Sequence, residues 1–194
     1  TLTDSSGNNH TGAISGAAWT TSGRYGAALS FDGVNDWVTV NDSNLLDLTT
    51  GMTLEAWVYP TATLTNWRTV IAKEGASPVI AYYLYASSQP DNRPANGVTI
   101  GGTEYALRAG SAPAVNTWTH LTATYDGTMQ RLYVNGVEVA SQARTGSIQT
   151  TVNPLRIGGN SLWGEYFTGR IDEVRVYNRA LTQPEIQTDM NSAL

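Results

Sequence analysis

The chain has 194 residues, of which 41% are hydrophobic, 14% are charged and 19 are glycine. A single β-sandwich domain is commonly of about this size, so we expect one domain over residues 1–194. The net charge is -5, and the sequence contains no block of like charge. This excludes nucleic acid as a partner. No apolar run approaches the roughly 20 residues that cross a bilayer. The absence of cysteine excludes disulfides, thiolate metal sites and thiol nucleophiles.

The ends of the chain suggest a piece of a longer protein. The sequence begins at Thr1 without an initiator Met, and no charged segment followed by an apolar one opens it. We therefore expect a monomeric module excised from a larger secreted, extracellular or cell-surface protein, with no membrane insertion.

Alternating segments rich in Val, Ile, Thr, Tyr and Trp recur about every ten to fifteen residues, between clusters of Gly, Asn, Asp or Pro. This spacing predicts an all-β, two-sheet antiparallel sandwich. The predicted strands are Ala28–Phe31, Trp37–Val40, Thr53–Tyr59, Arg68–Ala72, Ala81–Tyr85, Val98–Ile100, Thr117–Tyr125, Gln130–Val134, Val137–Ala140, Leu155–Ile157 and Gly169–Tyr177.

Two of these strands carry further information. In Thr53–Tyr59, the aromatic side chains of Trp57 and Tyr59 share a face with the polar residues. In Thr117–Tyr125 neither face is cleanly apolar, which is typical of a central strand that is covered on both sides.

Turns and loops separate the strands. The pair Asn135-Gly136 predicts a type I′ hairpin, because both residues tolerate a positive φ. The stretches Ala86–Ala95 and Arg108–Asn116 contain prolines and small residues and predict loops.

One helix is predicted, at the C-terminus. Thr182 can cap it, Pro184 lies in its first turn, and Glu185 completes a capping box before Ile186 and Met190.

Seven segments in this order resemble one family. They are DSSGNNHTG (4–12), LSFDGVNDWVTV (29–40), MTLEAWVYP (52–60), WTHLTATYDG (118–127), RLYVNGVEVAS (131–141), PLRIGGN (154–160) and GRIDEVRVYNRALTQPEI (169–186). Together they are similar to laminin-G-like jelly-roll domains, the bacterial branch of the concanavalin-A-like lectin and glucanase superfamily. The resemblance implies a jelly roll that accompanies secreted glycoside hydrolases, polysaccharide lyases or adhesins, commonly as a carbohydrate-binding or interaction module with a structural calcium ion.

A calcium site is predicted near the N-terminus. Asp4, Ser6 and Asn8 alternate and are followed by the carbonyl of His10, which would bring hard oxygens round one cation. Asp172 is the chosen distant carboxylate, because a regular strand places it beside Val174 and Val176, where a bare charge is costly. The resemblance implies a metal role for this acid as well.

Two other interpretations remain open for these residues. The N-terminal segment can form an Asx-type turn, while Asp172 can bind backbone N–H groups or pair with Arg175 or Arg179. The acidic turn Asp32–Asp36 is interpreted as ordinary turn chemistry rather than a second ion site.

Catalysis is not predicted. A retaining glycosidase needs two carboxyls about 5 to 5.5 Å apart, and no predicted strand carries acids at alternate positions. Asp172 and Glu173 point to opposite faces of a regular strand. His10 and His120 have no evident partner for a triad, and His120 is interpreted as a core residue.

Binding is predicted from aromatic rings and planar polar groups, because the apolar faces of sugars stack on rings and their hydroxyls need fixed partners. Core packing is the competing interpretation for each ring. Three tyrosines close together, Tyr82, Tyr83 and Tyr85, must place some rings on the outer face. Tyr105, between Glu104 and Arg108, is a further candidate. The selected ligand-binding residues are Trp163, Tyr83, Glu165, Tyr166, Trp67, Arg68, Arg93 and Tyr105.

The sequence thus predicts a non-catalytic carbohydrate-binding module with a structural calcium ion. It would hold a neighbouring catalytic or adhesin domain of the same parent chain near a polysaccharide or oligosaccharide. The alternatives are a protein-interaction or adhesion domain, and a structural spacer.

Overall fold

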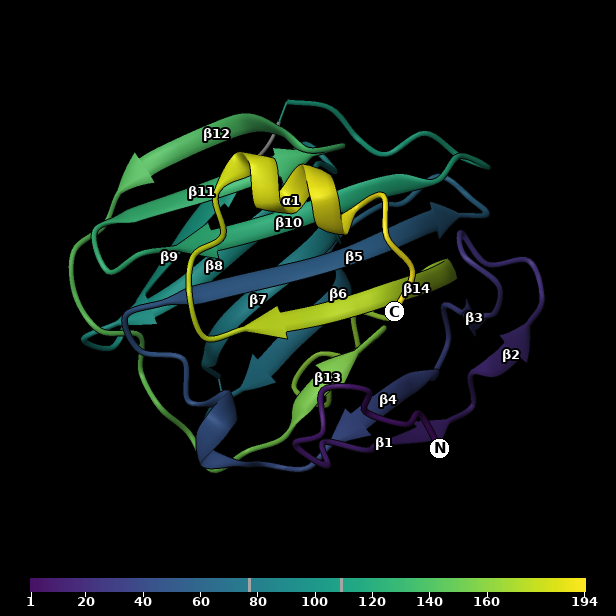
Figure 1. Ribbon diagram of the computed structural model, residues 1–194, viewed down its shortest axis with the longest axis horizontal. Helices are drawn as coiled ribbons and strands as arrows, with labels where there is room; N and C mark the ends of the chain where they lie inside the picture. The colour runs from purple at the N-terminus through teal and green to yellow at the C-terminus, as the bar shows by residue number, and fades with distance from the viewer. Residues whose placement is uncertain (77, 109) are drawn as a thin grey trace.

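The computed structural model describes residues 1–76, 78–108 and 110–194 and shows two antiparallel sheets packed face to face (Figure 1). The strands are β1 (Gly12–Ser15), β2 (Ala18–Thr20), β3 (Ala28–Asp32), β4 (Trp37–Val40), β5 (Met52–Pro60), β6 (Arg68–Glu74), β7 (Ile80–Ser87), β8 (Ala95–Ile100), β9 (Thr103–Arg108), β10 (Thr119–Tyr125), β11 (Met129–Val134), β12 (Val137–Ala143), β13 (Leu155–Ile157) and β14 (Thr168–Tyr177).

Each sheet contains seven strands. Sheet A has the order β1-β4-β13-β6-β7-β8-β9, and sheet B has the order β12-β11-β10-β5-β14-β3-β2. A 3-10 turn at Asn44–Leu46 and one helix, α1 (Gln183–Asp189), complete the elements. The predicted all-β jelly-roll sandwich with a short C-terminal helix is confirmed.

Alternation along the strands fills the space between the sheets. In β7, Tyr82 and Leu84 point into the core, and the Tyr82 hydroxyl donates to the Leu46 carbonyl at 2.8 Å. Tyr83 and Tyr85 point to the outer face of sheet A. The expectation that the tyrosine run divides between two faces is therefore confirmed.

The main local predictions are also confirmed. Asn135 and Gly136 have φ values of 51° and 72° and join β11 to β12 in a tight hairpin. Strand β10 is buried along its whole length between β11 and β5, as expected for a central strand. At α1, the backbone N–H of Thr182 donates to the Glu185 carboxylate at 2.7 Å, as expected for the capping box.

The structure departs from the prediction where strands are short or polar. Strands β1, β2 and β9 were not predicted from the sequence, because β1 and β2 have four and three residues and β9 begins with polar ones. It placed Ala86–Ala95 in a loop, but β7 continues to Ser87 and β8 begins at Ala95. In the predicted loop Arg108–Asn116, Arg108 ends β9, residues 110–116 form the loop, and Ala109 lies outside the described residues.

A β-bulge in β14 corrects one detail of the calcium prediction. Pairing with β5 shifts between Asp172 and Arg175, and Glu173 has a φ of 52°. The bulge exchanges the faces that follow it, so Val174 packs against the core, whereas Asp172 lies in register with Trp57 on the outer face. The expectation that Asp172 shares a face with Val174 was wrong, because it assumed a regular strand.

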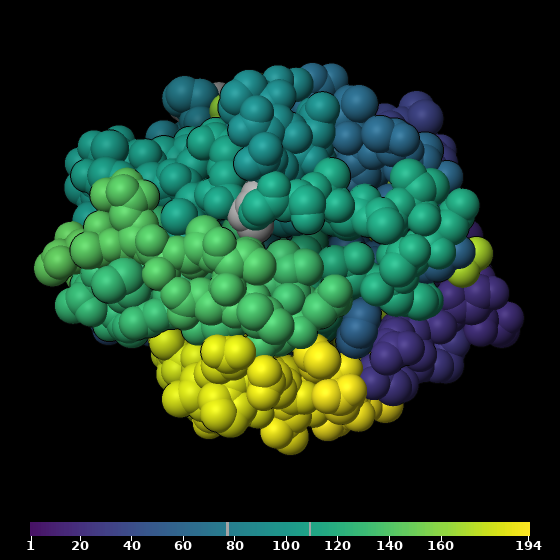
Figure 2. All heavy atoms as spheres, turned by 90° about the horizontal axis from the view of Figure 1, so that it is seen from above, coloured from purple at the N-terminus to yellow at the C-terminus, as the bar shows by residue number. Residues whose placement is uncertain are grey.

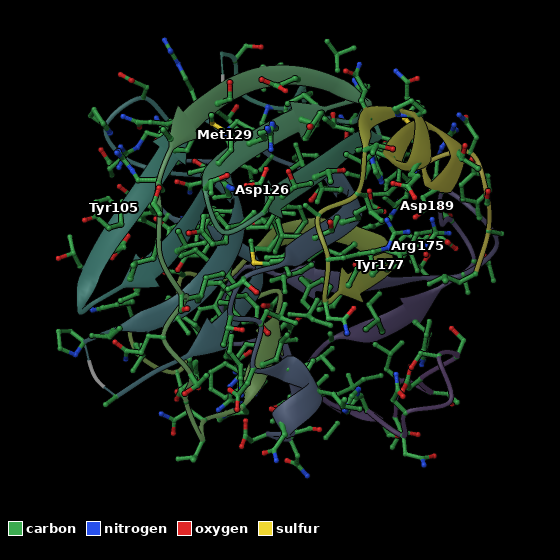
Figure 3. The ribbon with its side chains drawn as sticks, turned by 60° about the vertical axis from the view of Figure 1, so that its left-hand side comes forward. Tyr105, Asp126, Met129, Arg175, Tyr177 and Asp189 are labelled. Atoms are coloured by element: carbon green, nitrogen blue, oxygen red, sulfur yellow. The ribbon has the colours of Figure 1, made fainter. Side chains whose placement is uncertain are left out.

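Helix α1 covers a polar cluster on the outer face of sheet B. In register across this face lie Glu55 of β5, Thr122 of β10 and Arg175 of β14, and Thr122 donates to Glu55 at 3.3 Å. Figure 3 shows Arg175 and Tyr177 of β14 close to Asp189 of α1, and the Tyr177 hydroxyl donates to the Asp189 carboxylate at 2.7 Å. The cluster ties the helix to the sheet.

Burial shifts the ionisation of two residues in this cluster. Glu55 is fully buried, and its burial and then the negative charge of Asp189 raise its pKa to about 8, against the opposing charge of Arg175. His120 is 2% exposed, and its burial and then the charge of Arg175 lower its pKa to about 4. Both residues are therefore neutral at pH 7, which agrees with the interpretation of His120 as a core residue.

We expect the pH dependence of stability to report this arrangement. Between pH 6.5 and 8, folded Glu55 holds a proton that the unfolded chain has lost, so the free energy of unfolding falls as pH rises, by about 2 kcal/mol in total. Below pH 6.5, His120 binds a proton in the unfolded chain but not in the folded domain, which lowers the free energy of unfolding as pH falls. This loss offsets the increase in the free energy of unfolding that Glu55 contributes. Urea denaturation at several pH values should show the fall, and Glu55→Gln should flatten it. An unchanged slope in the variant would contradict this assignment.

Candidate functional site

The outer face of sheet A carries a floor of two tyrosines. The rings of Tyr83 and Tyr85 stack with centroids 4.5 Å apart, and they are 1% and 2% exposed. Gly97 of β8 makes room for this floor, since a Cβ atom there would lie 2.1 Å from the Tyr83 ring. Figure 2 shows the residues of β7 to β9 in teal on the opposite side of the molecule from α1 in yellow.

Each tyrosine hydroxyl is held by a carboxylate. Tyr83 donates to Glu104 of β9 and Tyr85 donates to Glu165, both at 2.7 Å. Burial and the neighbouring carboxylates raise the pKa of both phenols well above their usual value. Partial burial raises the pKa of Glu165, against the hydrogen bonds from Tyr85 and Asn160. The hydroxyls therefore remain protonated donors, and the second oxygen of each carboxylate stays available.

The segment 158–166 folds over one side of this face and is held by Asn160, which is fully buried. The Asn160 amide donates to Thr69 Oγ1 at 3.0 Å and to Glu165 at 2.7 Å, and its oxygen accepts from the backbone N–H of Trp163 at 2.8 Å. Backbone hydrogen bonds between Asn160 and Gly164 close the turn. One side chain thus fixes both the carboxylate and the loop that carries Trp163.

The groups above the tyrosine floor combine a ring with charges. Trp67 packs edge-on against Tyr85 with centroids 5.5 Å apart, and the Arg108 guanidinium lies 5.5 Å from the Trp67 ring. The charge of Arg68 acts on Glu165, which places this arginine beside the same group. An open sheet face with a ring, two carboxylates and two guanidinium groups can stack a flat apolar surface and bind the hydroxyls at its edges.

The structure gathers about half of the predicted ligand-binding residues. Tyr83, Glu165, Trp67 and Arg68 belong to the cluster just described. Trp163 is 51% exposed at the rim, in the loop that Asn160 anchors.

The other three predicted residues lie elsewhere. Tyr166 packs on Trp37, with ring centroids 5.8 Å apart. Arg93 is exposed, and its backbone carbonyl accepts from Ser88. Tyr105 packs against the core on the other face of β9 from Glu104, and the Arg144 guanidinium lies 4.7 Å from its ring.

Four residues of the cluster were not among those selected from the sequence. Tyr85 follows from the two-residue period of a strand once Tyr83 faces outward. Glu104 and Arg108 alternate with Tyr105 along β9, so recognising that strand would have placed them on the other face. Asn160 gives no local signal, because its role depends on contacts with Thr69 and Glu165.

The carboxylates of Glu104 and Glu165 were not considered as a possible catalytic pair from the sequence, because only acids along a single strand were compared. Glu104 comes from β9 and Glu165 from the segment 158–166, and the charge of Glu104 acts on Glu165. Both accept a tyrosine hydroxyl, which suits positioned hydrogen-bonding groups.

The predicted calcium ligands form a hydrogen-bonded turn in the described structure. The Asp4 carboxylate accepts from the N–H and hydroxyl of Ser6 and from the N–H of His10, each at 2.9 Å. Partial burial raises the pKa of Asp4, but these hydrogen bonds outweigh it, so that the pKa is lowered. The Ser6 hydroxyl accepts from Asn8, which is therefore also engaged within the turn.

Asp172 serves the loop between β2 and β3. Its carboxylate accepts from the backbone N–H groups of Arg24, Tyr25 and Glu173 at 2.7, 3.0 and 2.9 Å. Among residues 1–76, 78–108 and 110–194, no three His, Cys, Asp or Glu side chains form a metal-binding group. Asp4, Ser6, Asn8, His10 and Asp172 do line one cleft of about 810 Å³. The oxygens of Asp4, Ser6 and Asp172 accept N–H groups, as the alternative interpretation expects. Calcium binding stays a prediction.

We expect Asn160→Ala to lower the free energy of unfolding by about 2 to 3 kcal/mol, because it leaves buried polar partners without hydrogen bonds. Chemical denaturation measures the loss. Asn153→Ala serves as a control, since the Asn153 backbone, not its side chain, accepts from Lys73. An Asn160→Ala loss no larger than that of the control would show that Asn160 does not anchor the loop.

The calcium prediction implies that calcium raises the melting temperature of chelator-treated protein by several degrees, because an ion bound only to the native state stabilises it. An unchanged melting temperature would reject the site. Differential scanning fluorimetry checks this, with magnesium as the matched ion. A rise of several degrees with calcium alone would establish an ion bound to the native state, and loss of that rise in Asp4→Asn would locate it.

Comparisons with known proteins agree with this architecture. Domain 4 of AbnA, an extracellular GH43 arabinanase from Geobacillus stearothermophilus, solved in complex with arabinotriose, is 25% identical, with a TM-score of 0.83 over 97% of this chain and 92% of that one. The binding domain of Paraclostridial Mosquitocidal Protein 1 is 17% identical, with a TM-score of 0.78 over 97% of this chain and 49% of that one, and shares the fold.

Curated relatives match over a shorter stretch. Pappalysin-1 of Mus musculus is 39% identical over 80 residues, which are 39% of this chain and 5% of that protein. The human pappalysin-1 is 38% identical over the same length. A laminin-G family model matches residues 32–187. The chain therefore belongs to the concanavalin A-like lectin/glucanases superfamily.

Proposed function

We propose that this domain is a non-catalytic carbohydrate-binding module and that the outer face of sheet A binds a polysaccharide rich in pentose sugars. The observation that carries the proposal is the cluster of Trp67 with Tyr83 and Tyr85, edged by Glu104 and Glu165. A ring at the surface stacks on the apolar face of a sugar, and the carboxylates accept its hydroxyls.

The arabinanase domain supports the choice of sugar. That domain was solved with arabinotriose, and it matches this chain over nearly the whole length of both. Arabinan is therefore the first polysaccharide to test. Calcium is left out of the proposal, because the contacts of Asp4 and Asp172 give it no role at this face.

The setting of the domain is part of the proposal. The similar arabinanase is extracellular and its domain 4 is one part of a larger chain. We infer that this domain acts outside the cell and keeps a neighbouring catalytic or adhesin domain near its polysaccharide. In the described residues, no helix is long and apolar enough to span a membrane.

We expect linear arabinan in a native gel to retard the domain, and Trp67→Ala to weaken binding about tenfold, which is about 1.4 kcal/mol. Calorimetry with arabinotriose gives the affinity of the single site. Trp19→Ala is the matched control, because Trp19 is 53% exposed on β2, away from this face. Equal affinities of the two variants would reject the site.

The same preparation tests the absence of catalysis. No reducing ends should accumulate when the domain is incubated with arabinan, because the proposal gives Glu104 and Glu165 the role of hydrogen-bonding sugar hydroxyls. Release of sugar that disappears in Glu165→Gln would overturn the proposal in favour of a hydrolase. Capture of a protein partner without retention by any glycan would favour the adhesion alternative.

A further inference from the structure

A second surface lies on the outer face of sheet B, beside the C-terminal end of α1. Trp57 and Tyr59 occupy alternate positions of β5, and both point away from the core. Opposite Tyr59, Trp118 precedes β10 with its ring centroid 5.3 Å away, and Arg170 of β14 pairs with Tyr59 in register. Tyr59, Trp118 and Arg170 are all half-buried, whereas Trp57 is only 6% exposed and lies beneath the exposed Arg24.

Two arginines lie over these rings. The Arg170 guanidinium is 4.8 Å from the centroid of Tyr59, and the Arg24 guanidinium is 4.4 Å from that of Trp57. Among the described residues, neither guanidinium has a carboxylate within 4.0 Å. Arg108 and Arg144 also lie over rings without such a partner in the described part of the chain, but on separate rings, Trp67 and Tyr105. In a chain of net charge -5, two uncompensated cations on adjacent rings are a distinct feature.

The supporting groups are already fixed by hydrogen bonds. The Trp57 indole N–H and the Tyr25 hydroxyl both donate to the Met190 carbonyl at the end of α1, at 3.2 and 3.1 Å. Arg170 donates to the carbonyl of Ser22 at 3.2 Å. Little side-chain freedom is left to lose when a ligand binds.

Asp172 is the acid closest to this surface in the sheet register, next to Trp57. Its carboxylate already accepts three backbone N–H groups, including that of Arg24. It thus shapes the loop that presents Arg24 and does not neutralise the guanidinium within ion-pair distance.

The geometry points to an anionic saccharide as the ligand. Trp57 and Tyr59 are alternate residues of β5, about 6.6 Å apart along the strand, so the two guanidinium groups lie over neighbouring rings of one face. A stacked guanidinium keeps its N–H edge free for a carboxylate or sulfate, and the Trp118 ring adds an apolar platform.

The position in the sheet argues against an acidic peptide. Strands β5 and β14 have hydrogen-bonded neighbours on both sides, so no free edge is available to pair with a peptide backbone. This surface lies on the opposite side of the sandwich from the Trp67 cluster, and the inference does not rest on the arabinan proposal.

The test uses native gels containing polygalacturonate or dextran sulfate, with methyl-esterified polygalacturonate and plain dextran as neutral controls. Wild-type protein should be retarded by at least one acidic polymer, more weakly as salt rises, and not by its neutral form. Retardation by polygalacturonate alone would identify carboxylate as the ligand group, and retardation by dextran sulfate alone would identify sulfate.

The double variant R24Q/R170Q should lose at least tenfold in affinity for the retarding polymer. Arg144→Gln is the matched control, since that guanidinium also lies over a ring, 4.7 Å from the centroid of Tyr105. Trp67→Ala should retain acidic binding. Circular dichroism melting checks that each variant folds. If R24Q/R170Q does not fold, variants with Arg→Lys at both positions are measured for binding to the acidic polymer instead.

Three results would overturn the inference. They are the absence of retardation by both acidic polymers, equal retardation of the wild type and R24Q/R170Q, and tighter binding of poly-glutamate than of either polysaccharide. Loss of acidic binding in Trp67→Ala alone would move the anionic ligand to the face of sheet A.

Discussion

The alternation of side chains across two packed sheets constrains every other feature of this domain. Leu54, Ala56 and Val58 of β5 are buried between the sheets, which forces Glu55, Trp57 and Tyr59 onto the outer face. The same rule sends Tyr83 and Tyr85 of β7 outward. Apolar side chains fill most of the interior, with Asn96 and Gln130 as buried polar exceptions that bond to backbone carbonyls of the opposite sheet, so the candidate binding groups lie on the two outer faces and the loops at their edges.

The two outer faces handle buried polarity in different ways. On sheet A, the tyrosine hydroxyls find carboxylates from β9 and from segment 158–166, so their burial costs little. On sheet B, α1 covers Glu55 and His120, and both are kept neutral because their charged forms would lack sufficient compensation. A short helix of seven residues is stable there because Ile186 is fully buried and Tyr177 bonds to Asp189.

The sequence was sufficient for features that depend on local patterns. The long strands, the Asn135-Gly136 hairpin and the capping box of α1 each follow from residues within one segment. The bulge at Glu173 could not be predicted, because a single residue with positive φ changes the face of everything after it without altering the apparent alternation. Asn160 and Glu104 acquire their roles only when distant strands meet, so a search along one strand missed them.

The charges of the two faces separate the kinds of ligand that each can accept. On sheet A, the carboxylates of Glu104 and Glu165 are balanced by the guanidinium groups of Arg68 and Arg108, and this mixed set suits the hydroxyls of an uncharged sugar. Guanidinium groups stacked over Trp57 and Tyr59 attract an acid and gain little from a neutral sugar. Since the packed sheets stand about 10 Å apart with the core between them, a short oligosaccharide cannot touch both faces. A long polysaccharide with neutral and acidic stretches can pass round an edge of the sandwich, and the second contact then forms at the high effective concentration set by the first.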